Sequence, residues 1–346
     1  MRLQTAHSIP ICCSGIHMGK IQFPGLSRYK TSTNAIVDSV LNGIAQIYFQ
    51  PSKLTGAVLL FALYATRPAL ALAALAGVAI ANLSAHALHL PRQRIRDGLY
   101  GYNAALSCTG LCALYLPADF PDSLAAIQPH ASLLVWMAAA SIAGMAATHA
   151  LLRWNRLPAL TLPFVATMLL AALLGEKTGL LLQAVPAATG ARPLIEYQFY
   201  ALAQASFIGS APLGMLVLAA LAAYRWHEAV WALLGAGLAW CALTAASAQW
   251  LEAGPYLQQQ AIGVGLNCAL AAQGLTVHRR SWSWRLAGIA VTISLGTAFA
   301  MCGFACFTLP FVLASWMAMQ MSTASAENRR ASLVQTSPKT RSLDGA

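Results

Sequence analysis

Long apolar runs without a single charged residue constrain this chain more than any other feature of its sequence. They cover residues 70–90, 131–152, 229–250 and 308–321. A helix needs about 20 predominantly apolar residues to cross the ~30 Å hydrocarbon core of a bilayer. Only 9% of the 346 residues are charged and 58% are hydrophobic, which excludes an ordinary soluble domain. The sequence therefore predicts an all-α polytopic membrane protein.

An internal repeat divides the apolar runs into two halves. Gln46 and Gln204 are separated by 158 residues (204 − 46), and the pentapeptide Thr-Leu-Pro-Phe-Val occurs at 161–165 and again at 308–312. The glutamine and glycine positions, the Gly-x-Asn-x-Ala-Leu segments and the Thr-Leu-Pro-Phe-Val segments follow one another in the same order in both halves, which chance does not explain. The other matched positions are Gly56 and Gly214, Gly77 and Gly235, and the Gly-x-Asn-x-Ala-Leu segments 101–106 and 265–270.

Loop charges indicate that the two halves have opposite orientations in the membrane. Loop 91–97 carries three arginines, whereas its counterpart 251–257 carries only Glu252. Loop 118–129 carries two aspartates, whereas its counterpart 277–285 carries three arginines. Because basic loops stay in the cytoplasm, we expect an inverted-topology repeat. We also expect the protein to lie in the cell (inner) membrane with both basic tails on the cytoplasmic side.

Five spans per half produce this inversion, so we expect ten transmembrane helices plus two re-entrant half-helices, near 35–49 and 194–208. Polar segments at membrane depth occur only where they line a cavity. The expected spans are near 52–66, 68–90, 98–117, 130–152 and 157–175, then 212–224, 228–250, 258–276, 286–301 and 305–322. The expected organisation is a polar, basic segment 1–34, a first membrane repeat 35–175, a linker 176–193, a second membrane repeat 194–322 and a disordered tail 323–346.

The repeated motifs carry groups suited to a small, neutral, polar solute. Each repeated glutamine places an uncharged amide near an aromatic residue, and a buried amide is costly unless something hydrogen-bonds to it. Pro163 and Pro310 lack an N–H, which predicts that the carbonyls of Ala159 and Cys306 are freed as further acceptors. Asn103 and Asn267, in contrast, are interpreted as structural residues that bond to backbone near the preceding glycine.

Several kinds of chemistry have no support in the sequence. No Asp or Glu lies away from the ends of the expected spans, and no phosphate-binding loop or catalytic dyad occurs. The chain is therefore not expected to be an enzyme or to need a cofactor, and passive movement of a neutral solute is favoured. Ion-coupled uptake of a small amide or other neutral polar solute is the alternative, and a membrane-embedded enzyme or scaffold is a third reading.

Cysteines and net charge point to no further ligand. Of the eight cysteines, Cys108 and Cys112, and likewise Cys302 and Cys306, are four residues apart, but other metal ligands are not nearby. We interpret the cysteines as buried structural thiols and expect no metal site. The net charge of +11 lies in loops and tails, as membrane topology requires, so no nucleic-acid partner is expected.

Three motifs resemble those of the urea transporter family over roughly residues 36–322. They are Gly-x-x-Gln-x-x-Phe at 43–49, Gly-Leu-Tyr-Gly-Tyr-Asn-x-x-Leu at 98–106 and Leu-Pro-x-x-Thr-x-Pro-Phe at 157–164. The resemblance implies a homotrimer surrounded by membrane lipids, with a facilitative urea channel inside each protomer and urea as the substrate.

The resemblance also implies roles for single residues. Gln46 and Gln204 would bond the amide groups of urea at two equivalent sites, and Thr161 and Thr308 would lie at the constriction between them. Aromatic and leucine side chains would clamp the planar solute at each site. The implied site residues are Gln46, Ile47, Phe49, Tyr102, Leu106, Thr161, Gln204, Ala205, Phe207, Leu266, Leu270 and Thr308.

Overall fold

The computed structural model describes residues 35–116, 131–154, 157–180, 182, 192–246, 255–304 and 306–336. All regular secondary structure within these residues is helical, and five of the helices are long and apolar enough to cross a membrane. This confirms the expected class of a polytopic, all-helical membrane protein. The five are Pro68–Ala87, Ala131–Trp154, Ala211–Ala246, Gln260–Val277 and Trp282–Met301.

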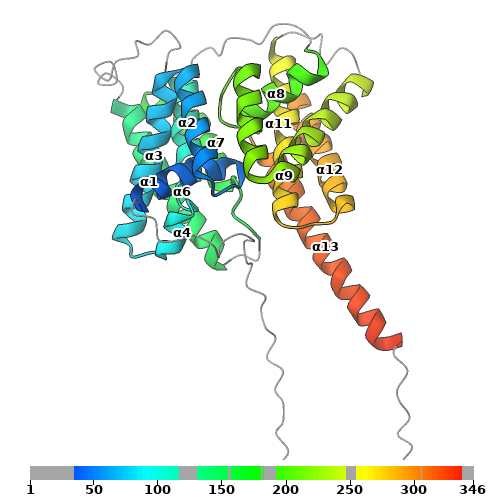
Figure 1. Cartoon of the computed structure of the whole chain (residues 1–346). Helices are drawn as coiled ribbons and strands as arrows, with labels where there is room; N and C mark the ends of the chain where they lie inside the picture. The colour runs from blue at the N-terminus through cyan, green and yellow to red at the C-terminus, as the bar shows by residue number, and fades with distance from the viewer. Residues whose placement is uncertain are drawn as a thin grey trace, which may run out of the picture.

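The helices form two groups that stand side by side (Figure 1). The first group contains α1 (Ala35–Ala45), η1 (Gln46–Tyr48), α2 (Lys53–Thr66), α3 (Pro68–Ala87), α4 (Arg92–Arg96), α5 (Tyr102–Tyr115), α6 (Ala131–Trp154), α7 (Leu162–Leu174) and η3 (Glu176–Thr178). The second contains α8 (Leu194–Gln204), α9 (Ala211–Ala246), α11 (Pro255–Val277), α12 (Trp282–Met301) and α13 (Leu309–Thr336).

Each group begins with a short helix at whose end a repeated glutamine lies: Gln46 directly follows α1, and Gln204 is the last residue of α8. α1 and α8 have 11 residues each, which at 1.5 Å per residue is about half the thickness of a hydrocarbon core. Three residues after each glutamine the backbone turns into the left-handed region, at Phe49 (φ 59°) and Phe207 (φ 61°). The same unusual turn therefore closes both short helices.

The repeated glycines lie where these short helices cross the next helix at backbone distance. A Cβ added to Gly56 would lie 2.0 Å from the carbonyl oxygen of Leu41, and one added to Gly214 would lie 2.1 Å from that of Phe199. Leu41 and Phe199 are themselves 158 residues apart (199 − 41). Small residues permit such close approach between membrane helices, so the sequence repeat corresponds to a repeated packing contact.

α9 contains the two expected spans, 212–224 and 228–250, as two helices that meet at a kink. Its one non-helical residue is Arg225 (φ −151°, ψ 90°), and the matching Arg67 separates α2 from α3 with similar angles (φ −166°, ψ 116°). Arg67 is followed by Pro68, which cannot continue the hydrogen bonding of a preceding helix. Trp226 stands at the position that matches Pro68, so the break at Arg225 occurs without a proline.

The expected tail 323–346 is partly helical, because α13 continues to Thr336. The expectation of disorder is therefore wrong for 323–336, and residues 337–346 lie outside the described part of the chain. The sequence after Ser322 contains alanines, a glutamate and two arginines, which favour helix. Their helix propensity allows α13 to continue beyond the apolar segment, as its protruding end in Figure 1 shows.

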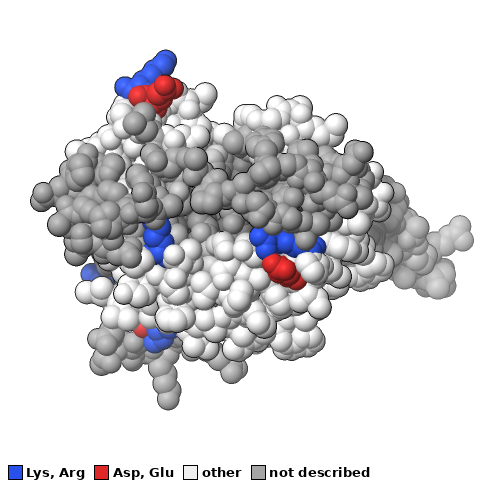
Figure 2. Space-filling view, turned by 90° about the horizontal axis from the view of Figure 1, so that it is seen from above, with Lys and Arg blue, Asp and Glu red and all other residues white. Residues whose placement is uncertain are grey.

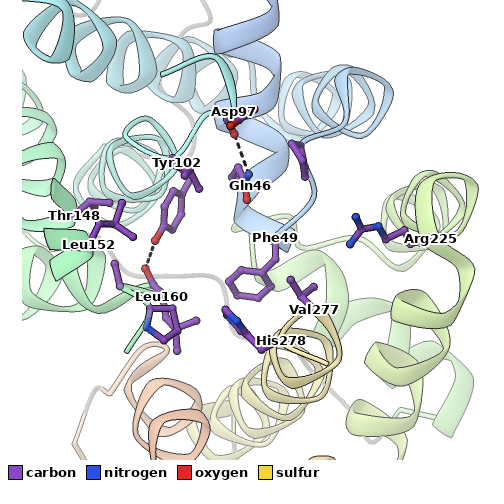
Figure 3. A pocket seen from close by; sticks show the side chains of 14 residues that line it. Gln46, Phe49, Asp97, Tyr102, Thr148, Leu152, Leu160, Arg225, Val277 and His278 are labelled. Atoms are coloured by element: carbon purple, nitrogen blue, oxygen red, sulfur yellow. Dashed lines mark hydrogen bonds between the residues drawn. The ribbon is translucent and has the colours of Figure 1, made fainter. Parts of the chain in front are cut away.

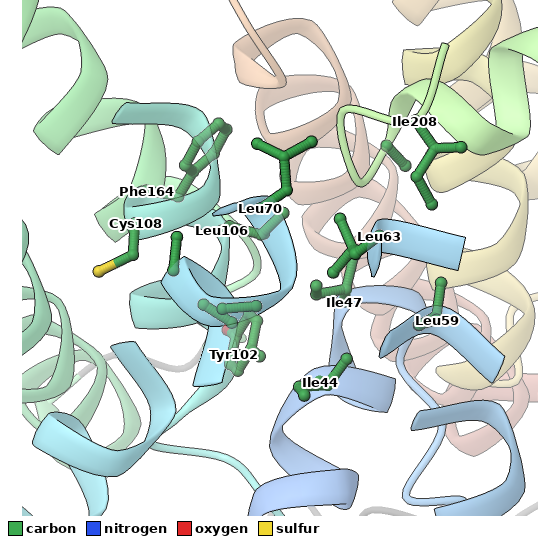
Figure 4. Packing of buried hydrophobic residues seen from close by; sticks show 14 of the residues in the cluster. Ile44, Ile47, Leu59, Leu63, Leu70, Tyr102, Leu106, Cys108, Phe164 and Ile208 are labelled. Atoms are coloured by element: carbon green, nitrogen blue, oxygen red, sulfur yellow. The ribbon is translucent and has the colours of Figure 1, made fainter. Parts of the chain in front are cut away.

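The largest apolar cluster draws on both groups of helices. Figure 4 shows Leu59, Tyr102 and Phe164 of the first group near Ile208, which precedes α9 in the second. The cluster also contains Phe311 of α13, fully buried. The two groups therefore share one core.

The cysteines are divided between core and surface. Cys108, Cys112, Cys268 and Cys306 are buried free thiols, as expected, whereas Cys241 and Cys302 are exposed. The expectation of burial is wrong for the two exposed residues, because they lie on the outward faces of α9 and the end of α12, where an apolar thiol can face lipid. Cys12 and Cys13 lie outside the described residues.

Charge is unevenly distributed between the two ends of the molecule. The arginines of α4 lie at the same end as the protruding end of α13 (Figure 1). Figure 2 views the opposite end, where only a few charged side chains are visible among the described residues. This asymmetry is the one that basic cytoplasmic loops produce in membrane proteins.

Candidate solute-binding site

Gln46 combines a fixed position with access to a pocket. It is the first residue of η1, is 9% exposed, and its Nε2 donates a hydrogen bond to the backbone oxygen of Asp97 at 2.9 Å (Figure 3). Sequence reasoning treated the partner of this amide as solute alone. The structure corrects this, because one N–H bonds to protein while the side chain also lines the pocket.

The pocket lies between the two groups of helices. It is lined by residues of the first group of helices, by Arg225 of α9, and by Val277 and His278 at the end of α11. Three of the twelve implied site residues line it, namely Gln46, Phe49 and Tyr102. The other lining residues are Pro51, Asp97, Leu99, Thr148, Leu152, Pro158, Ala159, Leu160, Arg225, Val277 and His278 (Figure 3).

The phenylalanines after the two glutamines each pack against the opposite half. The ring of Phe49 lies 5.7 Å from that of Phe311, and the ring of Phe207 lies edge-on to Phe164 at 6.1 Å. Phe164 and Phe311 are the phenylalanines of the two Thr-Leu-Pro-Phe segments, so the motifs of each half meet those of the other. The eight apolar site residues all belong to or pack against one cluster: Ile47, Phe49, Tyr102, Leu106, Ala205, Phe207, Leu266 and Leu270.

The two motif threonines meet directly. Thr161 Oγ1 and Thr308 Oγ1 are 2.6 Å apart and form a hydrogen bond, and the residues are 1% and 5% exposed. One comes from the segment before α7 and the other from the segment before α13. The structure thus brings these two site residues together from positions 147 residues apart in the chain.

The motif prolines do not free the carbonyls that the sequence suggested. α7 begins at Leu162 and α13 at Leu309, so each proline lies in the first helical turn, where its missing N–H costs nothing. The carbonyl of Ala159 accepts the N–H of Leu162 (3.3 Å), and that of Cys306 accepts the N–H of Leu309 (2.9 Å). The expectation of free acceptors at these two carbonyls is therefore wrong.

Two asparagines hold the Thr-Leu-Pro-Phe segments in place. Leu160 (φ 46°) and Phe307 (φ 48°) adopt left-handed backbone just before the threonines. Their carbonyls accept hydrogen bonds from Asn103 Nδ2 (3.2 Å) and Asn267 Nδ2 (2.8 Å). The asparagines thus have structural partners, but the expected bond near the preceding glycine is present among the described residues only for Asn267, whose Nδ2 also donates to the carbonyl of Gly263 at 2.8 Å. The asparagine oxygens also accept from the N–H groups of Phe164 (3.4 Å) and Phe311 (3.1 Å).

A buried carboxylate, which sequence reasoning did not anticipate, pairs with an arginine of the same element and bonds to the first half. Glu228 is 1% exposed, and its Oε1 lies 2.8 Å from Nη1 of Arg225. Its Oε2 accepts a hydrogen bond from Gln50 Nε2 at 3.1 Å, and Gln50 follows η1 in the first half. Burial of a single charge is prohibitive, whereas a hydrogen-bonded pair is tolerated. In the sequence, these two charged residues were marked only by their position at the boundary between the expected spans 212–224 and 228–250.

Two titratable residues that line the pocket have pKa values shifted by burial. The pKa of Asp97 is raised to about 6 by burial, against the opposing effect of a hydrogen bond from Gln93. The pKa of His278 is lowered to about 4 by burial and by the charge of Arg280. Sequence reasoning missed both, although Asp97 directly precedes the Gly-Leu-Tyr-Gly-Tyr-Asn motif.

These features define a polytopic helical membrane protein with a small pocket in which an amide and aromatic rings come together. Comparison with known families matches residues 37–323 to the family described as "Urea transporter". The chain therefore belongs to the urea transporter family.

Individual relatives are more distant. The chain is 27% identical over 170 residues to "Urea transporter 1" of Rattus norvegicus, covering 49% of this chain and 42% of the relative. It is 34% identical over 85 residues to proteins of the same name from Ovis aries and Capra hircus, covering 25% of this chain and 22% of each relative. The matched segments thus span less than half the length of these relatives.

Proposed function

We propose that this protein is a facilitative channel that lets urea cross the cell membrane down its gradient. The observation that carries the proposal is the paired arrangement of an amide and an aromatic ring. In each half a phenylalanine with left-handed backbone angles lies three residues after the glutamine. Its backbone N–H donates to the backbone oxygen of that glutamine at 3.0 Å. Each ring then packs on the Thr-Leu-Pro-Phe segment of the other half. Family membership supports the same solute.

The side chains suit the shape and polarity of urea. The amide oxygens of Gln46 and Gln204 accept N–H groups at the solute's edge, replacing part of its hydration shell. Phe49 and Phe207, with the leucines and Tyr102, cover its flat faces. The hydroxyls of Thr161 and Thr308 are hydrogen-bonded to each other between the two sites. When urea passes between them, this bond breaks and both hydroxyls bond to the urea molecule instead.

The proposed architecture has ten transmembrane helices and two re-entrant half-helices in two inverted repeats, 35–175 and 194–322, joined by the linker 176–193. The backbone contacts at Gly56 and Gly214 support it, because they join equivalent residues 158 positions apart. The arginines of α4, at the same end of the molecule as the protruding end of α13, support a cytoplasmic C-terminus. The homotrimer rests on the family resemblance alone.

Liposomes containing the purified protein are expected to take up urea much faster than empty liposomes in a stopped-flow light-scattering assay. A pathway lined by amide, hydroxyl and aromatic groups removes most of the cost of dehydrating the solute. Glycerol of equal osmolarity serves as the control, because its shape is not planar. Equal permeability of protein-containing and empty liposomes to urea would contradict the proposed function.

Urea movement is expected to be independent of membrane potential. The solute is neutral, and the buried carboxylate Glu228 is compensated by Arg225, so no net charge crosses the field. Electrical recording of the protein in planar bilayers should detect no current when urea is added, with or without a sodium or proton gradient. A reproducible urea-evoked current would instead support the ion-coupled alternative.

A further inference from the structure

Arg225 brings a guanidinium group to the wall of the pocket. It lies at the kink of α9 and lines the pocket together with Gln46 and Phe49. Its side chain is 23% exposed, and Figure 3 shows its nitrogen atoms directed toward the pocket. Unlike the buried carboxylate Glu228 beside it, which is 1% exposed, this side chain has surface that a solute can contact.

Three other polar side chains of the pocket each use an N–H or O–H group within the protein. Tyr102 Oη, Thr148 Oγ1 and Gln46 Nε2 all donate to backbone oxygens. A guanidinium group, in contrast, carries five N–H donors in one plane. Glu228 accepts from one of the donors of Arg225, at Nη1. Arg225 is therefore the richest source of hydrogen-bond donors on the pocket wall.

The equivalent arginine of the first half, Arg67, has a different role. It precedes Arg225 by 158 residues (225 − 67), and its Nη2 donates to the backbone oxygens of Leu116 (3.1 Å) and Cys112 (3.5 Å) at the end of α5. It thus satisfies carbonyls that the end of a helix leaves open. Three positions after Arg67 stands a leucine, whereas three positions after Arg225 stands a glutamate. The two halves therefore differ where the second arginine lines the pocket.

Glu228 fixes the guanidinium group relative to the first half of the site. Its Oε1 lies 2.8 Å from Nη1 of Arg225, and its Oε2 accepts from Gln50 Nε2 at 3.1 Å. Gln50 is fully buried and directly follows Phe49 in the chain. One hydrogen-bond network therefore places both the guanidinium group and the segment that carries the aromatic ring.

We propose that Arg225 is a further solute-binding residue, whose guanidinium group donates a hydrogen bond to the carbonyl oxygen of urea in the pocket. The proposal rests on the proposed function. The amide oxygens of the site accept the N–H groups of urea, but its carbonyl oxygen needs a donor in place of the water it loses. A charged donor forms a stronger bond than a neutral one. Glu228 balances its charge, so the donor is supplied without a net charge.

The test measures exchange of radiolabelled urea in liposomes over a range of urea concentrations. Arg225→Met combined with Glu228→Gln removes both charges together, because a single buried charge left unpaired would destabilise the fold. The new glutamine keeps an oxygen for Gln50 Nε2. At low urea concentration we expect flux per folded channel to fall about ten-fold, the effect of losing one hydrogen bond to a charged group. The half-saturating urea concentration should rise.

Two further variants separate binding from a structural role. Arg225→Lys keeps a positive charge beside Glu228 but lacks the planar set of donors, so the half-saturating concentration should rise while the melting temperature stays close to that of the unmodified protein. Arg67→Met is the matched control, because it removes the same group at the equivalent position away from the pocket. It should lower the melting temperature, since two backbone oxygens lose their donor, but keep the half-saturating concentration.

An unchanged half-saturating concentration in the double variant and in Arg225→Lys would overturn the assignment to Arg225. An equal rise in Arg67→Met would overturn it as well, because the effect would then not depend on the pocket. If the double variant fails to fold, Arg225→Lys decides the matter. Absence of urea flux in the unmodified protein contradicts the proposed function instead, so the two failures are distinguishable.

Discussion

Gly56→Ala is expected to prevent stable folding. The new Cβ would lie 2.0 Å from the carbonyl oxygen of Leu41 and 2.7 Å from its carbonyl carbon, both backbone atoms that cannot rotate away. α1 would have to move off α2 and would carry Gln46 with it. Overpacking typically costs about 1–3 kcal/mol even where side chains can adjust, so we expect a loss of about 3 kcal/mol or more, measured as a lower melting temperature in detergent.

Gly214→Ala should behave alike, because its Cβ would lie 2.1 Å from the carbonyl oxygen of Phe199. Gly263→Ala is the matched control: it adds the same methyl group to α11, where no atom lies within 4 Å. Alanine is favoured over glycine in helices by about 1 kcal/mol, so this control should be neutral or stabilising. A wild-type melting temperature for Gly56→Ala and Gly214→Ala would contradict the close backbone contacts.

Gln204→Leu is expected to reduce urea flux about ten-fold or more without lowering the melting temperature. Within the described part of the chain the Gln204 side chain makes no hydrogen bond, so its replacement leaves no protein group unpaired. An N–H of bound urea would instead lose its acceptor, at about 1–3 kcal/mol, and 1.4 kcal/mol is a factor of ten in rate. Stopped-flow flux and thermal melting are measured on the same preparation.

Gln46→Leu should reduce flux similarly but also lower the melting temperature, because it leaves the backbone oxygen of Asp97 without its donor. Gln198→Leu is the matched control on α8. Its Nε2 donates to the carbonyl of Leu233 at 2.9 Å, so stability should fall while the flux per folded channel is kept. Wild-type flux in stable Gln204→Leu and Gln46→Leu would exclude both glutamines from the solute site.

Several site features could be read from the sequence because they depend on local or repeated patterns. A glutamine near a phenylalanine in an apolar segment, and a proline two residues after a threonine, recur in both halves. The structure places Thr161 and Thr308 in contact and gives Phe49 and Phe207 the same backbone turn. A motif that occurs in both halves identifies such residue pairs even when their distance in space is not known.

The errors arose where hydrogen-bond partners come from distant segments. Proline chemistry predicted a freed carbonyl at Ala159, but that prediction assumes the proline is inside a helix, and α7 begins only at Leu162. The partner of Gln46 is a backbone oxygen 51 residues away, and that of Glu228 is an amide 178 residues away. No periodicity or spacing in the sequence encodes these pairings.

The sequence alone determined the class of protein, and it predicted two similar halves and the amide and aromatic groups of the candidate site. The length of an apolar segment and the recurrence of a motif depend only on the order of residues, so both can be read without coordinates. Only the tertiary structure decided that Asp97 lies buried beside the pocket, that Arg225 pairs with Glu228, and that Phe49 and Phe207 each pack on the opposite half. These depend on how the two halves meet, because burial and pairing are properties of the space between helices.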